Sequence, residues 1–121
     1  MQAPKEVIMV RPFAFGYDPE TAISNAFQHK PSKNDKTKSY SDIALEEFDD
    51  SVATLQSFGV KITIFNEEPS AIKKPDSVFP NNWFSTHQNG TIILYPMLAK
   101  SRRLEKRQDI VHYLQHNFGV T

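Results

Sequence analysis

Two helical segments of this 121-residue chain end in the same three residues, and this repetition limits the fold more than any other feature. Phe-Gly-Val occurs at 58–60 and again at 118–120, and each helical segment follows a predicted strand that ends in proline. A strand, helix and strand unit that recurs at a fixed period is typical of modular architectures such as propellers. We therefore predict an α/β fold with repeats at about 1–65 and 75–121. Together they form a single partial domain, the N-terminal part of a longer protein.

Hydrophobic patterns and turn signals place the elements along the chain. A capping box at Ser39 and apolar residues at three-and-four spacing indicate the first helix, while Asn89-Gly90 is a strong hairpin signal. The Lys-rich segment 29–40 has the composition of a solvated loop. The predicted strands are 6–10 (a buried strand), 60–65, 83–87 and 91–95, and the predicted helices run from Ser39 to Gly59 and from Lys100 or Ser101 to Gly119.

Composition narrows the class of partner. An apolar content of 39% with 12% aromatic residues is enough to build a globular core. A formal net charge of zero argues against a general nucleic-acid or membrane surface, because both attract an excess of Lys and Arg. Without a membrane span or a signal sequence, we expect a cytoplasmic protein that binds a small molecule. An uncovered sheet edge in an incomplete repeat also makes a homo-oligomer one of the expected partners.

The chain contains no cysteine, which excludes disulfides, thiolate metal sites and a cysteine nucleophile within it. His112 and His116 have the i,i+4 spacing of metal ligands on a helix. No acidic residue accompanies them as in the His-Glu-x-x-His motif, so we predict neither a metal site nor a cofactor.

The best candidate for a binding site is the stretch from Pro75 to Phe84, which contains Asp76, the adjacent Asn81 and Asn82, and the only Trp. These polar groups precede a predicted hairpin, and the edge of a rigid sheet is a common position for binding residues. Asp76 and the two amides could equally cap a turn. Arg102 lies in the first turn of a predicted helix, where the dipole disfavours a cation, so it is either a surface residue or the partner of an anion.

Several segments resemble the guanidino-modifying enzymes, which include arginine deiminases, dimethylarginine dimethylaminohydrolases and amidinotransferases. The segments are Met-Val-Arg-Pro at 9–12, Phe-Gly-Tyr at 15–17, Asp-Ser-Val-Phe at 76–79 and Tyr-Pro-Met-Leu-Ala-Lys-Ser-Arg-Arg-Leu-Glu at 95–105. Asn-Asn-Trp at 81–83 and residues 21–28 are most similar to the citrulline-utilisation hydrolase branch, related to the amidinotransferases. The resemblance implies a five-bladed α/β propeller, the pentein fold.

The same resemblance implies a reaction and a set of site residues. In the family, a Cys thiolate attacks the planar carbon of a guanidine or urea, a His moves protons and carboxylates hold the nitrogens. Asp76, Asn81 and Asn82 match the substrate loop, and Arg102 matches the Arg that receives a substrate carboxylate. The Cys and His are expected downstream, so this chain alone should be inactive. The amide pair replaces a Glu-Asp pair that would hold a cationic guanidinium, which favours a ureido substrate such as citrulline over arginine.

Two interpretations remain open at this stage. In the first, the chain is the substrate-binding portion of a hydrolase or transferase acting on a guanidino or ureido amino acid. In the second, it is a stand-alone, non-catalytic α+β module with a ferredoxin-like fold that binds a small ligand. A ferredoxin-like domain would add a further strand after the second helix, which the sequence does not supply.

Overall fold

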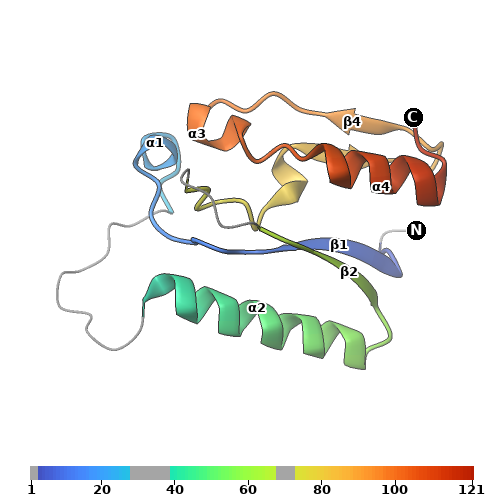
Figure 1. Cartoon of the computed structure of the whole chain (residues 1–121), viewed down its shortest axis with the longest axis horizontal. Helices are drawn as coiled ribbons and strands as arrows, with labels where there is room; N and C mark the ends of the chain where they lie inside the picture. The colour runs from blue at the N-terminus through green and yellow to red at the C-terminus, as the bar shows by residue number, and fades with distance from the viewer. Residues whose placement is uncertain (1–2, 28–38, 68–72) are drawn as a thin grey trace.

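A pair of parallel strands lies at the centre of the chain (Figure 1). In the computed structural model, which describes residues 3–27, 39–67 and 73–121, β1 (Glu6–Arg11) pairs with β2 (Lys61–Asn66) along the full length of both strands. A parallel pair requires a crossover connection, and here a helix supplies it. The expected α/β character of the fold is therefore confirmed.

The crossover helix is α2 (Tyr40–Ser57), which covers one face of the β1–β2 pair (Figure 1). Its beginning matches the predicted capping box, because the side chain of Ser39 accepts a hydrogen bond from the backbone N–H of Asp42 (3.1 Å). Phe48 and Val52 are its buried residues. The preceding Lys-rich segment lies outside the described residues, except for its last two positions.

The opposite side of the strand pair carries the hairpin and a second long helix (Figure 1). The hairpin consists of β3 (Phe84–Thr86) and β4 (Ile92–Leu94), which pair antiparallel as predicted. Both strands are shorter than predicted, because the loop between them is five residues long and is closed by a hydrogen bond from the His87 N–H to the Thr91 carbonyl (2.9 Å). The other short elements are α1 (Pro19–Ala22) and the 3-10 turn η1 (Pro80–Asn82).

The prediction of one continuous helix after the hairpin is wrong. The segment forms α3 (Lys100–Arg103) and α4 (Gln108–Phe118), and the backbone of Arg107 between them is extended. At about 100° per residue, a continuous helix would place Glu105 on the side opposite Leu114. The break instead allows both side chains to be buried.

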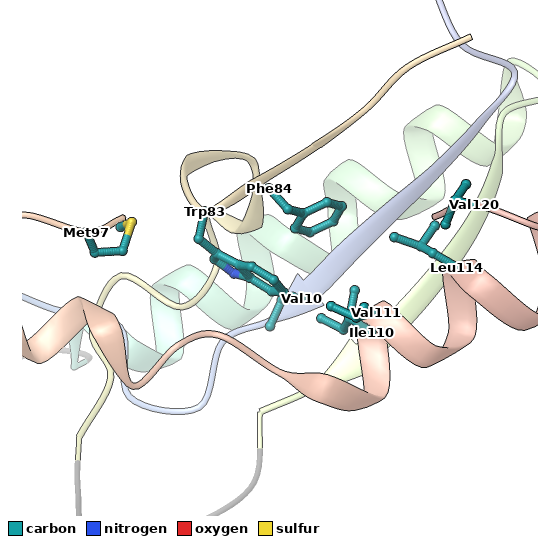
Figure 2. Packing of buried hydrophobic residues seen from close by; sticks show 8 residues of the cluster. All are labelled: Val10, Trp83, Phe84, Met97, Ile110, Val111, Leu114 and Val120. Atoms are coloured by element: carbon teal, nitrogen blue, oxygen red, sulfur yellow. The ribbon is translucent and has the colours of Figure 1, made fainter. Parts of the chain in front are cut away.

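The apolar core lies between β1, the hairpin and α4 (Figure 2). Its most deeply buried members are Ile110, Trp83 and Val10, which are at most 2% exposed. Val10 is the one buried side chain of β1, so the prediction of a fully buried strand there is wrong. Trp83 also belongs to the core and not to the candidate site. The buried members of the core are Val10, Trp83, Phe84, Met97, Ile110, Val111, Leu114 and Val120.

The two long helices end in the same way. Gly59 and Gly119 both have a positive φ (82° and 61°), a conformation that glycine adopts without a steric penalty. After the first helix, the Lys61 N–H donates to the carbonyl of Lys5 (2.9 Å) at the start of the β1–β2 pairing. After the second, Thr121 donates to the Gly90 carbonyl and accepts from the Ile92 N–H (both 2.9 Å).

This likeness agrees with the repeat, although the division into repeats and the propeller stay predictions. The described strands form two separate two-stranded sheets, β1–β2 and β3–β4. A ferredoxin-like domain has a single sheet, so the alternative fold is not the one observed. None of the helices in the described ranges is long and apolar enough to cross a bilayer.

Candidate functional site

A cavity of about 710 Å³ lies among α1, η1 and α3, and the core residue Met97 forms part of its wall. Three of the four predicted site residues, Asp76, Asn82 and Arg102, line it together. Aromatic and aliphatic side chains form most of the remaining wall. Those side chains are Phe15, Tyr17, Phe27, Tyr40, Phe79, Met97 and Leu98. A mainly apolar wall with a few convergent polar groups is typical of small-molecule sites.

Arg102 is the centre of the polar contacts in this cavity. Its Nη1 donates to Asn82 Oδ1 (2.9 Å), and its Nη2 donates to the backbone carbonyl of Asp76 (3.3 Å). Nε and Nη2 both donate to the carboxylate of Glu105 (3.1 Å each). The arginine side chain is 13% exposed, so it is not the surface residue of the alternative interpretation. Arg102 was expected to be the partner of an anion if it was not a surface residue, and that anion is Glu105.

Asp76 both shapes a turn and contributes to the site. Its backbone carbonyl accepts from the Phe79 N–H (3.1 Å), so Asp76 begins a turn through its backbone. Its side chain is buried: Oδ2 accepts a hydrogen bond from Thr21 Oγ1 (3.1 Å) and lies 3.9 Å from Arg102 Nε. The carboxylate therefore lies on the cavity wall, within reach of a ligand that carries N–H groups.

Glu105 is a site residue that the sequence interpretation missed. It is 3% exposed, and burial raises the pKa of its carboxyl group, an effect that the hydrogen bond from Arg102 opposes. The negative charges of Asp76 and Asp18 raise the pKa further. Two signals were available: Glu105 is the last residue of the family-like segment 95–105, and it is spaced i,i+3 from Arg102, which is common for surface pairs and therefore carries little information.

A second unpredicted group of contacts joins α1 to α3. Asp18 is 3% exposed; its Oδ1 accepts from the Glu20 N–H (2.9 Å), and its Oδ2 accepts from Ser101 Oγ (2.8 Å). The backbone N–H of Ser101 donates to Glu20 Oε2 (3.0 Å). These contacts fix α3, and therefore Arg102, relative to the wall that Thr21 contributes.

The two adjacent amides do not share a site. Asn82 faces the cavity with Arg102, whereas Asn81 lines a second cavity of about 780 Å³ between β1, the hairpin and α4. In a 3-10 turn, successive side chains are rotated by about 120°, which separates the neighbours. His87 lines the second cavity as well.

The cavity can bind a polar ligand, and the described residues suggest how. The carbonyl oxygen of Asn82 accepts from Arg102, so the amide NH2 is the part of that side chain left to donate to a ligand. Asp76 offers carboxylate oxygens on the same wall. Within 3–27, 39–67 and 73–121, no group of three or more His, Cys, Asp or Glu side chains could hold a metal ion. His112 and His116 are exposed.

The chain matches a known family. The model of a family described as N,N dimethylarginine dimethylhydrolase, eukaryotic, matches residues 11–120. The match confirms the resemblance to the guanidino-modifying enzymes. Neither the curated proteins nor the solved structures gave a match.

Proposed function

Because the chain belongs to the eukaryotic N,N-dimethylarginine dimethylhydrolase family, we propose that it is the substrate-binding portion of a hydrolase acting on a guanidino or ureido amino acid. The observation that carries the proposal is the convergence of Asp76, Asn82 and Arg102 on one cavity. The proposal places the nucleophilic Cys and its His elsewhere in the protein, since the chain has no Cys.

Within this class, we propose a ureido amino acid, citrulline, as the substrate. A ureido group has a carbonyl oxygen that accepts and N–H groups that donate, whereas a guanidinium only donates. The Asn82 amide can donate to the ureido oxygen, because its own oxygen is engaged by Arg102. Asp76 then accepts from the ureido nitrogens. With a guanidinium in the same place, the NH2 of Asn82 would face N–H groups, which cannot accept a hydrogen bond.

Arg102 is proposed to receive the substrate carboxylate through Nη1. Its Nε and Nη2 contact Glu105 and the Asp76 carbonyl, and one of the two Nη1 hydrogens is used by Asn82. The other Nη1 hydrogen is the one that these contacts leave for the substrate carboxylate. Asn81 was predicted to bind substrate as well, and its place in the second cavity gives that role no support.

A methylated arginine is the second candidate, and a specific observation favours it. The Arg102 guanidinium is bonded to the buried carboxylate of Glu105 and lies 3.9 Å from that of Asp76, and a third buried carboxylate, that of Asp18, is bonded to the neighbouring Ser101. An excess of buried carboxylates favours a cationic ligand. The family description names the same type of compound.

The substitution Asn82→Asp, with Asn81→Asp as the matched control, distinguishes the two candidates. A hydrogen bond to a charged group contributes roughly 1.5–3 kcal/mol, so Asn82→Asp should shift preference from citrulline towards arginine by about 10- to 150-fold. Asn81→Asp adds the same charge beside the other cavity and should leave the preference unchanged. Calorimetric titration with citrulline, arginine and N,N-dimethylarginine measures the three affinities. A wild-type preference for either guanidino compound would overturn the citrulline assignment and support the second candidate.

A further inference from the structure

The Glu105 carboxylate binds one edge of the Arg102 guanidinium. Glu105 is buried and Arg102 is partly buried, with side chains 2% and 13% exposed, and two nitrogens of the arginine are bonded to the one carboxylate. Arg102 lines the cavity of about 710 Å³, and Glu105 does not, so the carboxylate contacts the arginine from outside the cavity wall.

We propose that Glu105 is the positioning residue for Arg102: it holds the Nε–Nη2 edge and thereby aims Nη1 at Asn82 and the ligand. This inference rests on the proposed function, because it assigns the carboxylate-binding end of the site.

The geometry of the pair supports this role more than that of the other nearby carboxylates. A carboxylate bonded to two nitrogens fixes the plane of a guanidinium, whereas a single contact leaves it free to turn. Asp76 Oδ2 lies 3.9 Å from Nε, too far for a hydrogen bond, and Asp18 is bonded to Ser101. With Nε and Nη2 held by Glu105, the remaining nitrogen points to Asn82 Oδ1 at 2.9 Å.

The backbone is arranged to bring Glu105 inward. The i,i+3 spacing places the Glu105 carboxylate beside Arg102, and the interruption before α4 allows that carboxylate to be buried together with Leu114. In an uninterrupted helix, the same residue would point away from the core side of α4.

The first test observes the arginine directly by NMR. In Glu105→Gln, which keeps the size and removes the charge, the Arg102 Nε–H signal and the Asn82 side-chain amide signal should both move. Asp109→Asn is the matched control, because Asp109 binds Arg107 in the same two-point manner at the surface. It should leave both signals in place. An Asn82 amide signal that stays unchanged in Glu105→Gln would overturn the proposal.

The second test measures which end of a ligand is affected. Glu105→Gln should weaken binding of citrulline by about tenfold or more, and binding of its analogue without the α-carboxylate by less than about threefold. Glu105→Asp, which keeps the charge, should recover most of the loss, and it replaces the Gln variant if that variant does not fold. Equal losses for both ligands would indicate a merely structural role and sink the proposal. If the wild type binds neither ligand, the proposed function fails, while the NMR result still decides the positioning.

Discussion

Two arginines five positions apart each hold a carboxylate with two nitrogens, but one carboxylate is buried and the other is exposed. Glu105 in the first pair is 2% exposed, and Asp109, the partner of Arg107, is 53% exposed. Arg107 Nε and Nη2 lie 3.0 and 2.7 Å from the carboxylate of Asp109, so the two pairs have similar geometry. What differs is the exposure of the carboxylate to water.

The pKa values of the two carboxyl groups are shifted in opposite directions. The hydrogen bond from Arg107 is the main reason that the pKa of Asp109 is lowered. Burial is the main reason that the pKa of Glu105 is raised, although it too contacts an arginine. Two salt bridges of similar geometry therefore shift the pKa of their carboxyl groups in opposite directions, because one carboxylate is buried and the other is exposed to water.

The largest expected effect comes from removing the buried carboxylate. Glu105→Ala leaves Arg102 as a buried charge without its main counter-ion and should lower the free energy of unfolding by about 3–5 kcal/mol. Urea denaturation of the variant and the wild type measures the difference. A loss below about 1 kcal/mol would mean that the two pairs are energetically equivalent and that burial is not the deciding property.

The second prediction uses pH to separate the pairs. Because the folded-state pKa of Glu105 is raised above 4.5, the folded chain binds more protons than the unfolded chain in the window above that value. Stability should therefore fall as pH rises through this window, by at most about 1.4 kcal/mol per pH unit, and Glu105→Gln should abolish that slope.

Asp109 should give the opposite slope at lower pH. Its folded-state pKa is lowered, so its contribution is present above 3.8 and is lost as pH falls through the lowered value. Unfolding curves of wild type, Glu105→Gln and Asp109→Asn between pH 3 and pH 7 would show both windows. Parallel curves for all three proteins would contradict the assignment.

The third prediction concerns the exposed pair itself. Asp109→Ala removes a contact that is largely in water and should lower the free energy of unfolding by about 0.2–1 kcal/mol. Salt should reduce even this contribution. A loss as large as that of Glu105→Ala would show that Asp109 acts through another contact, such as its hydrogen bond from the Ile110 N–H.

The smallest effect is expected for a pair that links β1 to α2. Arg11 Nε and Nη2 donate to Asp49 (3.0 and 2.9 Å), and both side chains are more than a third exposed. Asp49→Asn should leave the melting temperature unchanged within the error of a circular dichroism melt. A clear decrease would mean that exposure is a poor guide to the contribution of such pairs in this protein.

Local patterns in the sequence were sufficient for most of the secondary structure. The Ser39 cap, the glycines after α2 and α4, and Asn89-Gly90 are signals that act within a few residues, and the corresponding helix start, helix ends and hairpin are observed. The break before α4 was missed, because apolar spacing alone does not show that the charged residue Glu105 is buried.

The site was only partly predictable for a similar reason. Asp76, Asn82 and Arg102 were found through residue type and family resemblance, and they lie together. Asp18 and Glu105 contribute through contacts that depend on tertiary structure, which sequence spacing does not reveal. Asn81 was grouped with Asn82 as its neighbour, although a tight turn directs the two side chains to different cavities.

The contacts of Ser101 have a consequence for the order of folding. They join Ser101 to Asp18 and Glu20 across sequence separations of 83 and 81 residues. Closing so long a loop costs conformational entropy before the contacts at its ends can form. Contacts between residues distant in the sequence therefore slow folding. We therefore expect this wall of the cavity to assemble after the α2 crossover. A ligand that binds only when this wall is in place would then slow hydrogen exchange in α1 and α3 more than in α2.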